Sequence, residues 1–497
     1  MSETQPASSS TGIVRRGGIT LAGAALGALL VFGNEIQVAR FLGVPSYGLY
    51  ALALVVARVA ETVALFGLRA AVMHFLPVQR EEGALGASLG TIIAAVALPL
   101  VLGCALSALL WFSAEWMARV LLDAPAVAPF LRLFALPVPL MALTEVLGVI
   151  TRGFGRAEYY VLIRNLTPPA CFAALLAVVN ALDAPPAAVA WAFGVSQAVA
   201  ALTGMAIVGW LIGRHDGWRR PTFAARRLYA YAFPIMLNTL LYVVMGATDI
   251  LMLGHMRGPE EAGVLRACLQ LRPAFDMAMV AFNAGAVHLY PVQHRAGDHA
   301  ALAASYRTVL RAVGGVSAGL CMLVMLSRHD VLALLGPAFV TSADAMAWLL
   351  AGLLVQGCLG SAGMLLVVVG HQREETLAAA LGMATNVLLN LWLIPRLGLT
   401  GAALAAGASL VVMNLVRVRF VRAALGLATW DRTVLGAIVL ATVIGALTAA
   451  LMAAVGLADG AGLWAMIARS ALALALFVGA AWLFARHQRE LLATRES

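Results

Sequence analysis

The chain contains no lysine, and only 11% of its 497 residues carry a charge. Soluble globular chains have about 25% charged and 45–50% apolar residues. Here 62% of the residues are hydrophobic and the mean hydropathy is +0.92, which excludes a soluble protein and indicates an integral membrane protein. The net charge of +9 comes from 33 arginines, an excess typical of cytoplasmic loops rather than of nucleic-acid binding.

The sequence also lacks the short motifs of catalysis and cofactor binding. It has no GxxxxGK[ST] loop, no HExxH or GxSxG, and no Cys/His cluster with metal spacing. The five cysteines lie in apolar runs without a CxxC motif, and we interpret them as small apolar fillers. No polar stretch is long enough for a catalytic domain. We therefore expect no enzyme activity, no metal, no cofactor and no nucleic-acid partner. We also expect no cleavable signal peptide, because residues 1–12 are polar and the first apolar run is long enough to span.

Long apolar runs dominate the rest of the chain. A membrane-spanning helix needs about 20 largely apolar residues, and the long runs do not alternate as barrel strands do. We predict an all-α integral membrane protein with about fourteen transmembrane helices. The fourteen runs cover residues 17–40, 47–70, 84–112, 127–151, 158–181, 187–213, 227–253, 262–291, 302–327, 339–369, 374–395, 399–421, 433–456 and 462–485.

Arginine placement predicts the orientation of these helices. With both termini in the cytoplasm, 22 arginines fall on the cytoplasmic side, five fall outside and six lie within the runs. Arginine-rich loops stay on the cytoplasmic side during insertion, so this distribution favours a multi-pass protein of the inner (plasma) membrane with cytoplasmic termini.

One stretch of sequence is written twice, 214 residues apart. Arg58 recurs as Arg272 and Glu35 as Asp249, while HFLPVQ at 74–79 corresponds to HLYPVQ at 288–293. The offset joins runs 1 and 2 to runs 7 and 8, which predicts two six-helix bundles of parallel topology and two additional C-terminal helices. The predicted parts are a cytoplasmic tail (1–16), a first bundle (17–213), a cytoplasmic linker (214–226), a second bundle (227–424), helices 13–14 (425–485) and a cytoplasmic tail (486–497).

Ionisable residues inside the runs are the candidate site. Such residues are costly in a membrane and normally face the protein interior or a water-filled cavity. In each repeat an arginine has an acid three or four residues later, on the same helix face, and a polar residue eleven positions later extends the stripe. These pairs either tie helices together or line a cavity, and their equivalent positions in two repeats favour the cavity. The set is Arg58, Glu61, Arg69, Arg272, Asp276 and Asn283.

Glu35 and Asp249 form a second pair of equivalent acids, toward the outer ends of runs 1 and 7. Each either reaches interfacial water as a structural residue or takes part in coupling transport to Na⁺ or H⁺. We keep them as coupling candidates.

Four stretches carry a resemblance to a known family. They are ARFLG and YGLY at 39–43 and 47–50, GFGR at 153–156, TDILMLG at 248–254, and NVLLN with IP and GLTGAA at 386–403. They resemble bacterial polysaccharide (O-antigen and exopolysaccharide) flippases, whose superfamily includes multidrug-and-toxin extruders and the lipid II flippase. The resemblance implies a V-shaped, MATE-like pair of bundles that moves a polyprenyl-pyrophosphate-linked oligosaccharide to the periplasmic side, driven in some members by a cation gradient.

Three function classes follow. A lipid-linked oligosaccharide flippase is the leading hypothesis, because arginines suit a pyrophosphate head group. It implies membrane lipids and a polysaccharide polymerase as partners. A cation-coupled multidrug or small-molecule exporter is the alternative, and it predicts an acidic cavity. A membrane enzyme of the same pathway generally needs a large outer loop, and the outer loops here are short.

Overall fold

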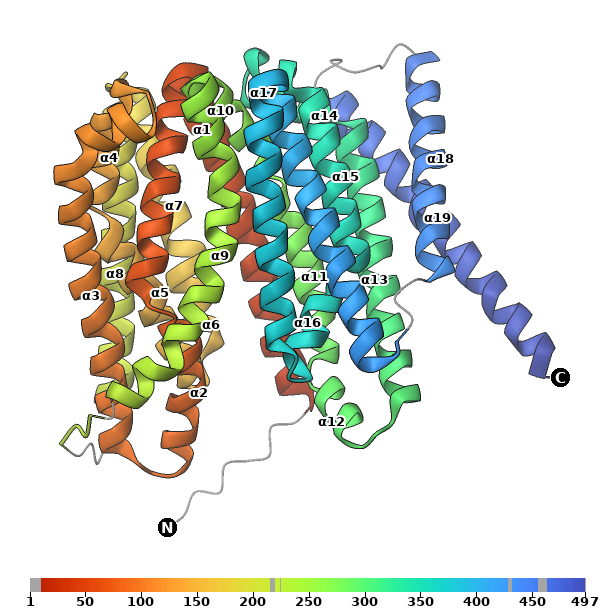
Figure 1. Ribbon diagram of the computed structural model, residues 1–497, viewed down its shortest axis with the longest axis horizontal. Coiled ribbons are helices and arrows are strands. Elements are labelled where there is room, and N and C mark those ends of the chain that lie inside the picture. Colours follow the sequence, from red (N-terminus) through yellow and green to blue (C-terminus); the bar gives the residue numbers. More distant parts are fainter. Residues whose placement is uncertain (1–9, 215–219, 224, 428–430, 455–462, 497) are drawn as a thin grey trace. The chain divides into compact units, whose positions relative to one another are not determined.

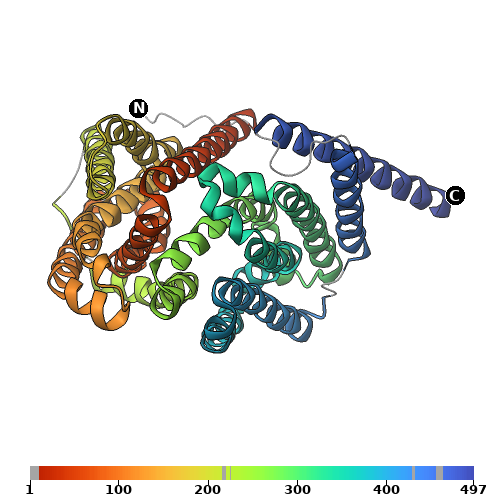
Figure 2. The ribbon, with the colours of Figure 1, turned by 90° about the horizontal axis from the view of Figure 1, so that it is seen from above.

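The computed structural model describes residues 10–214, 220–223, 225–427, 431–454 and 463–496. These residues are almost entirely helical, and they include no strand. The chain divides into two compact units, residues 1–263 and 264–497. Within each unit most helices run side by side (Figure 1), and the view turned by 90° sees them nearly end-on (Figure 2). The all-α prediction is confirmed.

The described part of the first unit is built from nine α-helices, short π-helical and 3-10 segments, and the first five residues of a tenth helix. They include α1 (Ser10–Leu65), α2 (Leu68–Glu81), α3 (Leu85–Trp116), α4 (Ala128–Ala135), α5 (Val138–Gly153), α6 (Ala157–Tyr160), η3 (Val161–Leu166), α7 (Thr167–Ala181), α8 (Ala187–Gly213), α9 (Ala225–Arg257) and α10 (Pro259–Leu269), which ends in the second unit.

The second unit holds the remaining helices. They are α11 (Arg272–Ala286), α12 (Leu289–Arg295), α13 (His299–Leu326), α14 (Arg328–Leu335), α15 (Ala343–Leu359), α16 (Ser361–Val368), α17 (Gln372–Leu425), α18 (Arg432–Ala454) and α19 (Leu463–Glu496).

Two of the long helices fold back on themselves at a glycine. Gly43 in α1 has φ 65° and Gly398 in α17 has φ 54°, a region that favours glycine. Pro45 and Pro395 each remove a helical hydrogen bond beside the bend. Residues Glu35 and Tyr47 would lie about 18 Å apart along a straight helix, yet their side chains are hydrogen-bonded. The predicted breaks between runs 1 and 2 and between runs 11 and 12 fall at these bends.

Among the described residues, nine helices are long and apolar enough to cross a membrane, or ten if the bent pair α4–α5 counts as one. Two of the nine, residues 22–81 and 372–425, contain the folded-back bends, so each covers two of the predicted runs. The chain is therefore a multi-pass membrane protein. The number fourteen stays a prediction.

The structure breaks several runs that the sequence predicted as single helices, two of them beside a proline. Run 127–151 becomes α4 and α5, bent by 42° beside Pro137. Run 262–291 becomes α10, α11 and α12. Pro273 lies at the start of α11 and cannot donate to the preceding turn, which ends α10 there. A continuous apolar run therefore does not ensure a continuous helix.

In the first unit, α9 packs against α1, α2 and α3. Gly67, between α1 and α2, has φ 71°, and a Cβ at this position would lie 2.2 Å from the carbonyl oxygen of Ala232 in α9. Only glycine suits both the backbone conformation and this close approach. This packing places α9 in the compact first unit, although the repeat assigns run 7 to the second bundle. Compact units group helices by contact rather than by repeat, so the bundle boundaries stay a prediction.

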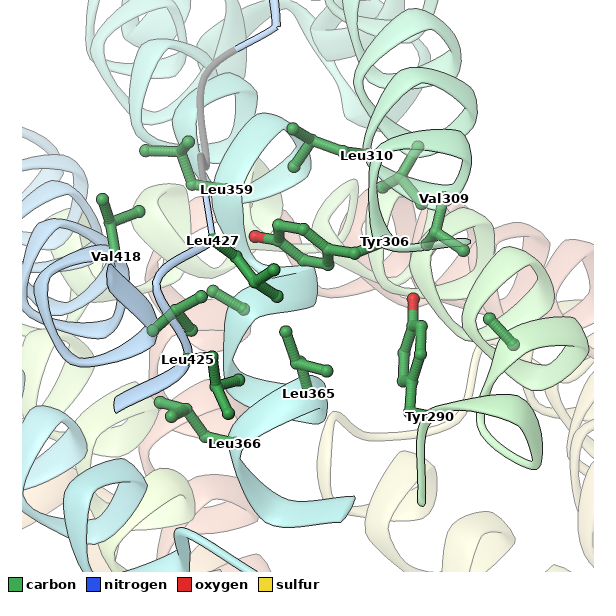
Figure 3. Close-up of a cluster of buried hydrophobic side chains, with 14 of the residues drawn as sticks. Tyr290, Tyr306, Val309, Leu310, Leu359, Leu365, Leu366, Val418, Leu425 and Leu427 are labelled. Atoms are coloured by element: carbon green, nitrogen blue, oxygen red, sulfur yellow. The ribbon is translucent and has the colours of Figure 1, made fainter. Parts of the chain in front are cut away.

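The second unit has its own apolar core, shown in Figure 3. Tyr290 of α12 and Tyr306 of α13 are fully buried there, among leucines such as Leu365 of α16. Val418 of α17 and Leu427, just after that helix, close the cluster. This core fixes the short helices α12 and α16 against the long helices of the unit.

Candidate functional site

Arg58 and Glu61 lie one turn apart on α1. Arg58 Nη1 is 3.0 Å from Glu61 Oε2, and the Thr62 hydroxyl donates to the Arg58 carbonyl oxygen. The Arg58 side chain is 41% exposed, whereas the Glu61 side chain is 7% exposed. The carboxylate is therefore held inside the bundle while the guanidinium reaches open space, an arrangement in which the arginine can change partner.

Glu145 of α5 is the centre of a larger charge cluster. Arg164 Nε lies 2.5 Å from Glu145 Oε2, and Arg69 Nε lies 3.4 Å from Glu145 Oε1. The Tyr160 hydroxyl donates to Oε1 over 3.3 Å, and the Arg152 guanidinium stacks on the Tyr160 ring at 3.6 Å. The Glu145 side chain is only 5% exposed. One buried carboxylate thus holds side chains from α2, α6 and η3.

Arg69 reaches this cluster because the helix breaks before it. α1 ends at Leu65, and Phe66 and Gly67 both have positive φ. The chain therefore changes direction there, and Arg69 lies in the first turn of α2. The predicted stripe from Arg58 to Arg69 along one continuous helix is therefore wrong. Arg69 pairs with Glu145 instead of continuing the row of Arg58 and Glu61.

Arg164 lies in a π-helical turn, and the sequence explains that turn. Pro168 and Pro169 follow it and have no N–H to donate to the carbonyl groups of Arg164 and Asn165, so the regular helical ladder cannot form. Gly27 of α1 lies against the Asn165 carbonyl, where a Cβ would approach the oxygen to 2.4 Å. The prolines and this close packing together set the direction of the Arg164 side chain toward Glu145.

Arginines outnumber acids in this part of the first unit. Arg58, Arg69, Arg152 and Arg164 share two carboxylates, Glu61 and Glu145. Glu61 and Glu145 both act electrostatically on Arg164, which joins the two pairs into one cluster. Its formal charge is +2. The side chains of Arg58 and Arg69 are 41% and 60% exposed, so an anion can reach part of this positive charge.

The coupling candidates are both buried in the first unit. Glu35 is 6% and Asp249 is 4% exposed. The Tyr47 hydroxyl donates to Glu35 Oε2 over 2.8 Å across the bend of α1. Beside Glu35, the Asn34 amide donates to the Pro169 carbonyl oxygen of α7. Protein atoms therefore cover both acids almost completely.

In the second unit, Arg272 Nε lies 3.6 Å from Asp276 Oδ2 on α11. The Gln356 amide of α15 donates to Asp276 Oδ1 over 3.2 Å. Asn283 lies about two turns beyond Asp276 on α11 and is buried. Its side-chain amide donates to the Met279 carbonyl oxygen, whereas its Oδ1 accepts no hydrogen bond. The longer distance leaves the Arg272 pair looser than its counterpart Arg58–Glu61.

Sequence reasoning missed two buried ion pairs. Arg417 and Glu375 join the two halves of α17, and Arg469 of α19 pairs with Asp330 of α14. All four side chains are less than 10% exposed. Arg417 is one of the 22 arginines that the predicted topology places on the cytoplasmic side. The signal that was available was an acid and an arginine on opposite sides of the Gly398 bend, about twenty residues from it. In the part of the chain that the structure describes, no group of His, Cys, Asp or Glu could hold a metal ion.

Two family profiles match the sequence. The profile described as "Polysaccharide biosynthesis protein" matches residues 13–296, and the MatE profile matches residues 234–392. A search of curated sequences gave no match.

Solved structures share the fold at low sequence identity. An inward-facing multidrug resistance MATE family transporter of the MOP superfamily is 15% identical, with a TM-score of 0.70 over 82% of this chain and 98% of that chain. The lipid II flippase MurJ in an inward closed conformation is 10% identical, with a TM-score of 0.72 over 94% and 99%. A MOP superfamily transporter from Pyrococcus furiosus is 15% identical, with a TM-score of 0.58 over 83% and 95%. These likenesses confirm the predicted MATE-like fold. Because the first profile covers more than half of the chain, the protein belongs to the polysaccharide biosynthesis protein family.

Proposed function

We propose that this protein is a flippase that moves a polyprenyl-pyrophosphate-linked oligosaccharide across the inner membrane. The substrate enters from the cytoplasmic leaflet and leaves in the periplasmic leaflet by alternating access. It then serves the synthesis of O-antigen, exopolysaccharide or a similar surface polymer, where a polysaccharide polymerase uses it. Membership of the polysaccharide biosynthesis family and the fold of the MOP transporters support this proposal.

The observation that carries the proposal is the excess of arginine around Glu145. The cluster has a formal charge of +2, and the side chains of Arg58 and Arg69 are partly exposed, which favours an anionic partner and disfavours a cationic one. A pyrophosphate brings at least two negative charges. Guanidinium groups bind phosphate oxygens in a forked geometry, so several arginines can replace the water that the head group loses.

The acids in the cluster can pair again with the arginines after the substrate leaves. Glu61 holds Arg58, and Glu145 holds Arg164 and Arg69, when no substrate is bound. A site of unpaired arginines would trap the head group, whereas exchange between carboxylate and phosphate allows release. We propose that Arg272, with Asp276 as its return partner and Asn283 nearby, makes the equivalent contribution from the second unit.

Glu35 and Asp249 are proposed as the residues that couple transport to a Na⁺ or H⁺ gradient. Both are carboxylates in buried surroundings, where binding of a cation or proton relieves a large desolvation cost. The Tyr47 hydroxyl on Glu35 lies beside the bend of α1, so a change of charge on Glu35 acts where two helix segments meet.

The second candidate function is a cation-coupled multidrug exporter. The MatE profile match at residues 234–392 and the likeness to a MATE transporter favour it. The arginine excess disfavours it, because cationic drugs need an acidic cavity. For the Pyrococcus furiosus transporter, a reversed polarity of the binding pocket is described as suggesting a different function. Here too, the charge of the candidate site is the criterion that separates the two functions. We propose no enzyme activity.

The test uses purified protein in proteoliposomes with a fluorescent polyprenyl-pyrophosphate disaccharide, and ethidium as the cationic competitor. We expect transport of the glycolipid and none of ethidium. Arg164→Gln should lower glycolipid transport strongly. Arg119→Gln is the matched control, because Arg119 forms an exposed pair with Glu115 outside the cluster. Transport of ethidium without the glycolipid would establish the second candidate.

A further inference from the structure

The second unit contains an apolar cavity of about 520 Å³ that the proposed function does not use. It lies between α13, α15 and α18, with one wall formed by Met322 and Leu350. Its volume is in the range of about 300–1,000 Å³ that is usual for ligand pockets.

Small residues on α18 create this cavity. Gly445, Ala446, Ala449 and Ala453 line it, and their short side chains leave space that larger residues would fill. α18 also packs closely beside the cavity, since Ala441 and Ile444 belong to an apolar cluster with Met322 of α13 and Phe477 of α19. The cavity is thus a local groove beside a well-packed interface.

The groove has a polar end. Arg328 and Arg469 are its two charged lining residues. Arg469 is buried in an ion pair with Asp330, so its charge is already balanced. Arg328 donates through Nη1 to the Met325 carbonyl oxygen, and its Nε is buried without a hydrogen-bond partner. Arg328 follows directly after run 302–327 and belongs to the few arginines on the predicted outer side.

The dimensions fit a lipid chain. From Ile438 to Ala453 the groove follows fifteen residues of α18, or about 22 Å at 1.5 Å per residue. One leaflet of the hydrocarbon core is about 15 Å deep, so the groove is long enough for an acyl chain that crosses one leaflet. An apolar groove open to the bilayer loses dispersion contacts unless a hydrocarbon chain fills it.

We propose that this groove binds one anionic phospholipid of the outer leaflet, with an acyl chain along α18 and its phosphate on Arg328. The chain makes the apolar contacts with Met322 and the small residues of α18. The phosphate accepts hydrogen bonds from the part of the Arg328 guanidinium that lines the groove. The bound lipid joins α18 to α13 and α15 and thereby stabilises the second unit.

The experiment measures phospholipid retained by the full-length protein after purification in mild detergent, by lipid mass spectrometry per mole of protein. Ala446→Trp fills the groove. Ala450→Trp is the matched control, because Ala450 lies one turn further on α18, is exposed and does not line the groove. We expect phosphatidylglycerol to be retained by the wild type and the control and lost from Ala446→Trp.

Thermal stability with added lipid supplies the second readout, which does not depend on the folding of one variant. Phosphatidylglycerol should raise the melting temperature of the wild type more than phosphatidylcholine does. Arg328→Gln should bind phosphatidylglycerol about tenfold more weakly, because one charge-assisted contact is lost, while Arg328→Lys keeps most of the preference.

Three results would overturn the proposal. They are equal retention by Ala446→Trp and Ala450→Trp, equal stabilisation by the two lipids, and displacement of phosphatidylglycerol by polyprenyl pyrophosphate. The last result would assign the groove to a polyprenyl chain instead of a phospholipid. None of these outcomes depends on whether the protein transports a glycolipid.

Discussion

Arg417 and Glu375 form a forked ion pair although 42 residues separate them in the sequence. Arg417 Nε donates to Glu375 Oε2 over 2.9 Å, and Nη2 donates to Oε1 over 2.5 Å. Asn414 accepts a third hydrogen bond, from Nη1. Gly363 of α16 covers the pair, and a Cβ there would lie 2.9 Å from both Arg417 Nε and Glu375 Oε2. The pair fixes the register of the two halves of α17 around the Gly398 bend.

Removing one partner of this pair should destabilise the protein. Glu375→Leu leaves a buried guanidinium without its counter-charge, a change that costs about 3–5 kcal/mol. The double variant Glu375→Leu with Arg417→Leu should be much closer to the wild type, because no buried charge remains. Melting temperature in detergent is the measurement. Arg396→Gln is the control, since Arg396 is exposed on the Trp392 ring. A double variant as unstable as the single one would contradict this account.

Asp431 should make stability sensitive to acid. It lies just before α18, where its carboxylate accepts the Thr433 backbone N–H over 2.7 Å and pairs with Arg311 at 2.8 Å. Burial raises the pKa of Asp431, but the hydrogen bonds from Thr433 and the charge of Arg311 outweigh burial, and the net pKa is lowered.

A lowered pKa in the folded state stabilises the protein at pH values above the ordinary aspartate pKa of about 3.9. This contribution disappears as the pH falls through the lower folded value. Asp431→Asn should therefore be less stable than the wild type at neutral pH and should lose less stability between neutral pH and about pH 3. The measurement is the melting temperature as a function of pH. Parallel curves for the two proteins would show that Asp431 does not contribute.

Glu145 should be needed for folding as well as for transport. Glu145→Gln removes the counter-charge of Arg164 and Arg69 and should cost about 3–5 kcal/mol. Adding Arg164→Gln should recover part of that loss. Tyr160→Phe removes a neutral donor to the carboxylate and should cost only about 1 kcal/mol. Yield of monodisperse protein and melting temperature report these effects. A harmless Glu145→Gln would remove Glu145 from its central position in the cluster.

The predicted orientation can be tested with reporter fusions. The arginine distribution places Arg422 in the cytoplasm and Gly460 in the periplasm. Gly460 lies outside the described residues. A periplasmic phosphatase fused after Gly460 should be active, and one fused after Arg422 should be inactive. The reverse pattern, or the same side for both, would contradict fourteen spans with cytoplasmic termini.

Local chemistry made part of the fold predictable. Glycine and proline at 43–45 and at 395–398 mark the two bends, because their backbone preferences act within a few residues. Ion pairs such as Arg58–Glu61 are also local, since spacing of three or four residues places two side chains on one helix face.

The rest of the site depends on contacts that the sequence does not encode locally. Glu145 gathers Arg69 from α2 and Arg164 from a π-helical turn, and hydropathy alone does not indicate which helices meet there. Arg417 resembles any cytoplasmic arginine until the fold brings Glu375 beside it. Hydropathy predicts run 262–291 as one helix, because it does not take into account that Pro273 interrupts the helical hydrogen bonds.

In the proposed flippase, Arg58 and Arg272 bind the pyrophosphate. The direct test is the amount of surface polymer per unit of membrane-inserted protein. Arg58→Lys with Arg272→Lys should leave expression and insertion unchanged but sharply reduce polymer, because an ammonium group cannot form the forked contact. Arg58→Ala should be worse than Arg58→Ala with Glu61→Gln, because the single change strands a buried carboxylate. Wild-type levels of polymer in the double variant Arg58→Ala with Arg272→Ala would contradict the claim and leave both arginines as structural ion pairs.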